Sequence, residues 1–266
     1  MNAIEIKETL KSGGTVFGMM LTASRSPRWA KTYAQSGLDY IIIDTEHTPR
    51  SRSEVADLLA AFETTNVAPI VRIPIPSSHY VTMNLDAGAQ GILAPYCETI
   101  EEVKETVAAA KWRPLKGELV KQVIEKNVFP STASKEYLEQ RNANTICIIG
   151  IESVPAIENL NNILDIDGID AIFVGPNDLS ISLGVPNEYE HPIYEEALEK
   201  IIDICTKKNT PVMIHHQTVE LTKRWLSKGA KFVLHSTDTR AIHNAIQSDF
   251  SNIKESVNTI ESAETI

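Results

Sequence analysis

Short apolar runs alternate with longer amphipathic segments along most of the chain. In the amphipathic segments the apolar residues recur at helical spacing, which predicts helices with one buried face. The apolar runs are four to seven residues long and rich in Ile, Val and Leu, as buried strands are. A strand that is followed each time by a helix predicts parallel strands joined by right-handed crossovers. The predicted strands are 15–21, 40–43, 68–73, 91–94, 146–152, 171–175, 211–215 and 232–235.

The number of these repeats sets the expected architecture. Eight strands, each followed by a helix, predict an α/β fold of the closed (β/α)8 TIM barrel type, in preference to an open doubly wound sheet. A short helix at 3–11 precedes the first strand, and a helix at 239–247 closes the set. Residues 1–250 then form a single barrel domain. Residues 251–266 have few apolar anchors and are expected to form a flexible, frayed C-terminal tail.

The alternation lapses between Arg113 and Asn144. This stretch is too long for an ordinary connection between secondary-structure elements. Insertions at the active end of a barrel often form lids or binding loops, and a role of that kind is expected here.

Composition narrows the functional classes. A length of 266 residues suits one barrel domain, and the net charge of −10 argues against non-specific binding to nucleic acid or to anionic membranes. Three cysteines without Cys-x-x-Cys spacing, together with the lack of a signal-like or membrane-spanning apolar segment, predict a cytoplasmic protein. No glycine-rich phosphate-binding motif follows the first predicted strand, which argues against a dinucleotide cofactor.

Candidate chemistry first appears where the second predicted strand ends. The apolar run 40–43 is followed by Asp44, Glu46 and His47, and the carboxyl ends of barrel strands carry catalytic residues. Asp44 and His47 are therefore candidate catalytic residues. The alternative is that Asp44 or Thr48 caps the next helix and that His47 is a surface residue.

Three further polar residues lie at or just past the carboxyl ends of other predicted strands: Arg72, Glu152 and Asp178. Two carboxylates on neighbouring strand ends suit a hard divalent cation such as Mg²⁺ or Mn²⁺. A 2-oxo acid can share such a cation through its keto and carboxylate oxygens, and Arg72 suits the same carboxylate or a developing oxyanion. His47 is the natural proton carrier. Each residue can instead be a cap or an ion-pair partner, but caps have no reason to gather at one rim.

The chain resembles the HpcH/HpaI family of class II, metal-dependent aldolases, in the pyruvate/phosphoenolpyruvate barrel superfamily. The resemblance runs from about Gly14 to Ile246. The motifs that carry it are Ile43-Asp44-Thr45-Glu46-His47, Val71-Arg72, Leu85-Asp86-Ala87-Gly88, Ile151-Glu152 and Phe173-Val174-Gly175-Pro176-Asn177-Asp178-Leu179-Ser180.

The resemblance implies specific roles for matching residues. Glu152 and Asp178 would bind the metal, His47 would be the base, and Arg72 would stabilise the oxyanion and hold the substrate. The family also uses an aspartate matching Asp86 to raise the basicity of the histidine, from this chain or from a neighbouring subunit. Backbone groups of the turn at Pro176 and Asn177, beside Asp178, would contact the 2-oxo acid.

The implied reaction is reversible cleavage of a 4-hydroxy-2-oxo acid to pyruvate, or a related 2-oxo acid, and an aldehyde. Family members usually assemble as hexamers built from dimers that exchange the last helix. The resemblance therefore implies a homo-oligomer in which the segment 239–247 is exchanged.

Two positions depart from the family pattern. Gly150, at a substrate-binding position, stands where members commonly carry Gln, and the arginine of a Gly-x-Arg-Gly loop is missing near Leu115–Glu118. Two alternatives therefore stay open, an acyl-CoA lyase like the citrate lyase β proteins and a non-catalytic protein that binds a 2-oxo acid. Three histidines after the last two predicted strands either approach the mouth of the barrel or serve in packing: His215, His216 and His235.

Overall fold

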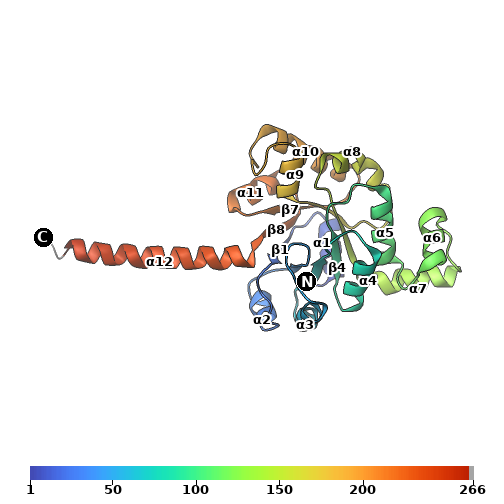
Figure 1. Cartoon of the computed structure of the whole chain (residues 1–266), viewed down its shortest axis with the longest axis horizontal. Coiled ribbons are helices and arrows are strands. Elements are labelled where there is room, and N and C mark those ends of the chain that lie inside the picture. The colour runs from blue at the N-terminus through green and yellow to red at the C-terminus, as the bar shows by residue number, and fades with distance from the viewer. Residues whose placement is uncertain (264–266) are drawn as a thin grey trace.

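The computed structural model describes residues 1–263, and it forms a closed barrel of parallel strands (Figure 1). The strands pair in chain order from β1 to β8, and β8 pairs with β1 to close the barrel, as predicted. The strands are β1 (Val16–Leu21), β2 (Tyr40–Asp44), β3 (Ala68–Arg72), β4 (Gly91–Ala94), β5 (Ile146–Gly150), β6 (Ala171–Val174), β7 (Val212–His216) and β8 (Phe232–Thr237).

Helices surround the barrel and follow each strand. Those predicted from apolar spacing are present, with ends shifted by a few residues. The helices are α1 (Ala3–Lys11), α2 (Trp29–Ala34), α3 (Arg52–Glu63), α4 (Ser78–Asp86), α5 (Ile100–Lys111), α6 (Gly117–Lys126), α7 (Thr132–Asn142), α8 (Val154–Ile163), α9 (Pro176–Ser182), α10 (Pro192–Lys207), α11 (Val219–Ser227) and α12 (Asp238–Ala263).

Side chains that point into the barrel form one of two apolar clusters. Alternate residues of each strand point inward, so Phe173 of β6 and Met213 of β7 meet at the centre. Ile6 and Leu10 of α1 join this cluster from the amino end of the strands. The barrel is therefore a packed core whose amino end is covered by α1.

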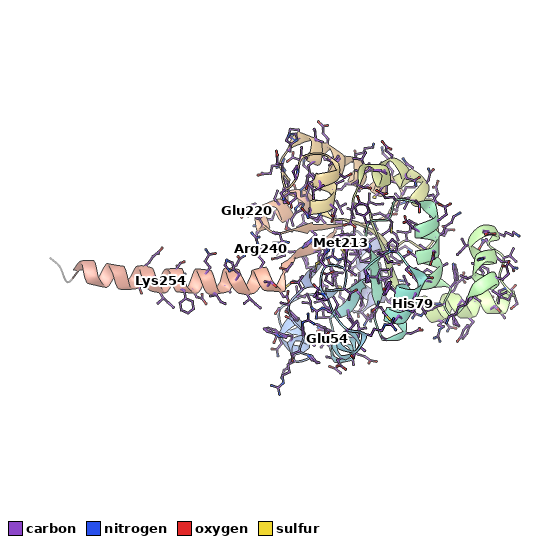
Figure 2. The ribbon with its side chains drawn as sticks, in the orientation of Figure 1. Glu54, His79, Met213, Glu220, Arg240 and Lys254 are labelled. Carbon is purple, nitrogen blue, oxygen red and sulfur yellow. The ribbon has the colours of Figure 1, made fainter. Side chains whose placement is uncertain are left out.

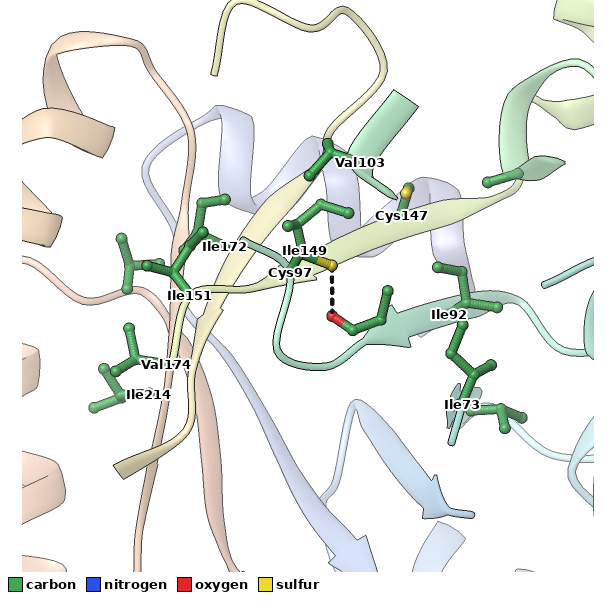
Figure 3. Packing of buried hydrophobic residues seen from close by; sticks show 14 of the residues in the cluster. Ile73, Ile92, Cys97, Val103, Cys147, Ile149, Ile151, Ile172, Val174 and Ile214 are labelled. Atoms are coloured by element: carbon green, nitrogen blue, oxygen red, sulfur yellow. Dashed lines mark hydrogen bonds between the residues drawn. The ribbon is translucent and has the colours of Figure 1, made fainter. Parts of the chain in front are cut away.

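The second cluster lies between the barrel and its helices. Every residue of β2 and β5 is buried, because one face of each strand packs in the barrel and the other packs under helices. Figure 3 shows Cys97 and Cys147 packed in this cluster among isoleucines of β5 and β6. All three cysteines are free and buried.

The segment between Arg113 and Asn144 is not a lid. It follows α5 and leads into β5, so the chain enters it at the amino end of the barrel. Its two helices, α6 and α7, stand at the side of the barrel beyond α5 (Figure 1). A lid or binding loop was expected on the assumption that this segment joins the active end of the barrel. The segment joins the opposite end.

Helix α12 is much longer than predicted and projects away from the barrel (Figure 1). It runs to Ala263, whereas a frayed tail was expected from residue 251 onwards; residues 264–266 lie outside the described part. Figure 2 shows the side chains of Arg240 and Lys254 on this projecting helix. Among residues 1–263, no helix combines the length and apolar character needed to cross a membrane.

Candidate active site

Most of the candidate residues line one cavity at the carboxyl ends of the strands. The cavity has a volume of about 320 Å³. Strand register explains why these residues lie together, because parallel strands that pair in order bring their carboxyl ends to one mouth. The predicted residues that line the cavity are Asp44, His47, Arg72, Glu152, Pro176, Asn177 and Asp178.

Arg72 is held in a fixed orientation by two acids that follow β2. Asp44 and Arg72 are direct neighbours in the register of β2 and β3. Arg72 Nε donates to Asp44 Oδ1 at 2.8 Å, and Arg72 Nη1 lies 3.0 Å from Glu46 Oε2. Its Nη2 donates to the sulfur of Met20 at 3.5 Å. The guanidinium is therefore positioned with donor capacity left on the cavity side.

Asp44 orients Arg72, and it does not cap α3. Burial by itself raises the pKa of Asp44, but hydrogen bonds from Arg72, from the Glu46 backbone and from Thr48 outweigh burial and lower that pKa. Ser51 is the residue that caps α3. The contacts of Asp44 are those of a residue that positions Arg72, and a catalytic role for Asp44 stays a prediction.

His47 lies at the exposed rim of the cavity. Its side chain is 62% exposed, and Nε2 lies 3.6 Å from Glu46 Oε2. Glu46 therefore stands between His47 and Arg72. Burial raises the pKa of Glu46, and the charges of Arg72 and His47 oppose that rise.

Glu152 is buried without a cationic side chain bound to it. It is 2% exposed, and Oε2 accepts a hydrogen bond from the Tyr96 backbone N–H at 2.5 Å. Burial raises the pKa of Glu152 to about 8. A Cβ atom at position 175 would lie 1.8 Å from Glu152 Oε1, so Gly175 makes room for this carboxyl. The chain therefore keeps space for a buried acid, and the charge of the nearby Arg72 offsets only part of the effect of burial on its pKa.

This arrangement fits a divalent cation. Asp178 lies near enough to raise the pKa of Glu152 further. A cation between the two carboxylates would offset both the cost of burying their charges and the repulsion between them. Over residues 1–263 no group of three or more His, Cys, Asp or Glu residues has the geometry of a metal cluster. Two carboxylates leave several coordination positions to water and substrate oxygens, as Mg²⁺ prefers.

The segment that carries Asp178 is a helix, whereas the sequence indicated a turn. Gly175 is its N-cap residue, and Pro176 occupies its first turn, where a missing N–H is harmless. Pro176, Asn177 and Asp178 all face the cavity from this first turn of α9.

Two predicted site residues lie elsewhere. Asp86 ends α4 at the amino end of the barrel, its side chain is 58% exposed, and it lies 3.6 Å from Arg113 Nε. Its role as the partner of a histidine stays a prediction about a neighbouring subunit. Gly150 does not line the cavity. A Cβ atom there would meet Glu152 Oε2 at 2.7 Å, so a larger residue would need the carboxyl to move.

The three late histidines have different environments. His215 lines the cavity. His216 reaches the cavity edge, but it is 2% exposed and its ring stacks on Trp225. His235 lies outside the cavity, where its Nδ1 is 3.0 Å from Thr222 Oγ1.

The sequence-based search missed several residues that line the cavity: Met20, Thr22, Tyr189, Gln217 and Thr237. The alternation of strand residues would have found Gln217, since it lies two residues beyond His215 on the same side of β7. Tyr189 lies in an irregular connection, where no periodicity could place it.

Comparisons with known proteins identify the family of this chain. A family model for HpcH/HpaI aldolase/citrate lyase matches residues 18–245. The 2-keto-3-deoxy-L-rhamnonate aldolase of Salmonella gallinarum is 30% identical, over 99% of this chain and 98% of that protein.

Solved structures share the fold. An HpcH/HpaI aldolase from Desulfitobacterium hafniense DCB-2 matches with a TM-score of 0.81 and 30% identity, over 94% of this chain and 96% of that one. A citrate lyase β subunit from Mycobacterium tuberculosis, complexed with oxaloacetate and magnesium, matches with a TM-score of 0.56 over 87% of this chain and 95% of that one. At 14% identity the second likeness concerns the fold alone. This chain is a lyase and belongs to the HpcH/HpaI aldolase/citrate lyase family.

Proposed function

We propose that this protein is a divalent-metal-dependent aldolase that reversibly cleaves a 4-hydroxy-2-oxo acid to pyruvate, or a related 2-oxo acid, and an aldehyde. The observation that carries the proposal is the buried Glu152, which has no cationic side chain bound to it and lines one cavity with Asp178, Arg72 and His47. A structural role for these residues would not require a buried acid that burial keeps protonated.

Glu152 and Asp178 would hold Mg²⁺ or Mn²⁺. The bound cation would supply Lewis-acid stabilisation to the 2-oxo group and its enolate. Pro176 and Asn177 would form the adjacent wall, against which the 2-oxo acid lies.

Arg72 would bind the substrate carboxylate or the enolate oxygen. Asp44 and Glu46 occupy Nε and Nη1, so the remaining donors are already aimed when the substrate arrives. His47 would take the proton from the C4 hydroxyl during cleavage and return it during addition. Glu46, 3.6 Å from the His47 ring, would stabilise the imidazolium that forms.

The assembled enzyme is proposed to be a homo-oligomer, a hexamer built from dimers that exchange α12, as the family resemblance implies. Helix α12 supports this, because it carries apolar side chains with no barrel surface beneath them: Ile242, Ile246, Phe250 and Ile253.

The test is exchange of the pyruvate methyl protons with deuterated water, followed by NMR with and without Mg²⁺. Enolate formation needs no aldehyde, so the acceptor does not have to be known. We expect metal-dependent exchange in the wild-type protein and its loss in Arg72→Ala. Glu220→Gln, on α11 outside the cavity, serves as the control and retains exchange (Figure 2).

Absence of exchange with several 2-oxo acids would contradict the proposal. The acyl-CoA lyase and the binding-only protein would then be the remaining alternatives. Metal-dependent cleavage of an acyl-CoA, or saturable 2-oxo acid binding without turnover, would distinguish them.

A further inference from the structure

The cavity has a second wall that the proposed reaction does not use. The catalytic candidates come from the ends of β2, β3, β5 and β6, where charged side chains gather. The opposite wall comes from the ends of β7, β8 and β1 and, besides Met20 and the stacked His216, carries only uncharged polar side chains. These are Thr22, His215, Gln217 and Thr237.

Two of these four side chains already form hydrogen bonds within the protein. Thr22 Oγ1 donates to Asp238 Oδ1 at 2.8 Å, and Thr237 Oγ1 accepts from the Arg240 backbone N–H at 3.2 Å. These bonds fix the β1–α2 loop and the start of α12. The free hydrogen-bonding capacity of this wall is therefore concentrated in His215 and Gln217.

His215 and Gln217 form a pair on the cavity side of β7. They are two residues apart, so they share the face on which Met213 joins the barrel interior. Gln217 Nε2 lies 3.3 Å from His215 Nε2, and Ser236 Oγ donates to Gln217 Oε1 at 3.5 Å. A hydrogen bond to the Ser236 backbone also holds the imidazole of His215.

The pair is electrically neutral and offers both a donor and an acceptor. Burial, and then the nearby Arg72, lower the pKa of His215 to about 3. The Gln217 amide has a second N–H beyond the one directed at His215. A hydroxyl group both donates and accepts, so it can take the place of the 3.3 Å contact between the two side chains, donating to His215 Nε2 and accepting from the Gln217 amide.

The same wall is unsuited to an anion. The positive charges that line the cavity can come only from Arg72 and His47, on the opposite side, and Arg72 already contacts two acids. A carboxylate or phosphate on the aldehyde would face a neutral wall in a cavity that also holds Glu152 and Asp178.

We propose that His215 and Gln217 bind a hydroxyl group of the aldehyde half of the substrate, so that the acceptor is a short, uncharged hydroxyaldehyde. This inference rests on the proposed aldolase function and specifies its substrate class. The cavity volume of about 320 Å³ is at the lower end of the roughly 300 to 1,000 Å³ of small-molecule sites, which limits the acceptor to a few carbons.

The test compares aldehydes within each variant. Addition of pyruvate would be measured with glyceraldehyde, with propanal, which has the same carbon chain without hydroxyls, and with the anionic glyoxylate. We expect wild type to favour glyceraldehyde in kcat/KM. In His215→Leu the glyceraldehyde to propanal ratio should fall about 10- to 100-fold, because a buried hydroxyl loses its partner.

Two more variants separate binding from general damage. Gln217→Met removes the amide at nearly constant size and should lower the same ratio, while His215→Asn, which keeps a polar side chain, should restore part of it. A ratio within one variant cancels any loss common to both aldehydes.

The possible outcomes distinguish the two proposals. Aldol addition with an unchanged ratio in both His215→Leu and Gln217→Met, or a wild-type preference for glyoxylate, would overturn the hydroxyl-binding wall and leave the aldolase intact. A wild-type protein that neither exchanges pyruvate protons nor adds any aldehyde would overturn both.

Discussion

Glu152 is buried next to Gly175, and no cationic side chain is bound to it, so its carboxyl retains a proton that an exposed glutamate would release. This makes the stability of the metal-free protein depend on pH. The folded-state pKa is about 8, against an ordinary value of 4.5. Between those values the folded chain binds a proton that the unfolded chain has lost. The stabilisation is therefore fully present below pH 4.5 and is lost as pH rises through 8.

Glu152→Gln should remove this dependence. In metal-free wild-type protein, Glu152 alone should lower the free energy of unfolding by ~1.4 kcal/mol per pH unit between about pH 5.5 and 7.5. The glutamine variant should lack that part of the slope, and urea unfolding at several pH values measures it. Glu220→Gln is the control and should behave as wild type. Equal slopes for wild type and Glu152→Gln would show that the carboxyl is already ionised.

His47 is exposed, so its replacement tests chemistry with little effect on folding. His47→Ala should lower kcat by about 10²- to 10⁴-fold, the usual contribution of a general base. The exposed His79, outside the cavity, provides the matched variant His79→Ala, which should retain the wild-type rate. A normal rate in His47→Ala would move the proton transfer to another group.

At the scale of single residues, the sequence was sufficient to identify site residues that stand at the end of apolar runs, because the ends of the strands meet at one mouth. Arg72, Glu152 and Asp178 line the cavity for that reason. Gln217 was missed because the apolar run ends before it, while β7 continues to His216. The packing of His216 against Trp225 depends on which face of β7 points outward, and that follows only from the register of the closed barrel.

Helix α12 is the element that local sequence reasoning described least well. Its apolar residues Ile242, Ile246, Phe250 and Ile253 are 42 to 56% exposed. Their spacings of four, four and three residues place them on one helical face. Three of these four residues precede residue 251, so few apolar anchors were counted in the segment after it. An isolated helix is marginal in water, and for both reasons a tail was expected. The apolar face indicates packing against another molecule.

Removal of this apolar face should weaken oligomerisation. Ile246→Glu combined with Phe250→Glu should shift the protein to smaller species, measured by light scattering after size-exclusion chromatography. Asn244→Glu combined with Ser251→Glu places the same charges on the opposite face of α12 and should leave the mass unchanged. An unchanged mass in the first double variant would contradict exchange of α12.

Helices packed on the barrel were predicted better than α12. In α3 and α5 the apolar positions match the buried ones, and Ser51 and Thr99 form capping boxes at their starts. Helix α9 was expected to be a turn because Gly-Pro-Asn-Asp is a common turn sequence. The length of the segment between Arg113 and Asn144 suggested a lid, but only its position after α5 decides which end of the barrel it joins.

On the scale of the whole molecule, counting strands was sufficient to predict the closed barrel. Eight repeats of strand and helix have few other arrangements, and the register confirms it. The covering of the amino end by α1 was not anticipated. The apolar residues Ile6 and Leu10 predicted an amphipathic helix but carried no information about the surface it packs on.

The packed interior of the barrel lies beneath the cavity, so its two key groups differ in exposure, and this has a kinetic consequence. Glu152 lies at the closed side, 2% exposed, and His47 at the open side, 62% exposed. In the proposed reaction the aldehyde forms next to His47 and blocks the way out for pyruvate. The aldehyde should therefore dissociate first. Pyruvate should inhibit cleavage competitively against the hydroxy-oxo acid, and the aldehyde non-competitively. Competitive inhibition by both products would indicate release in random order.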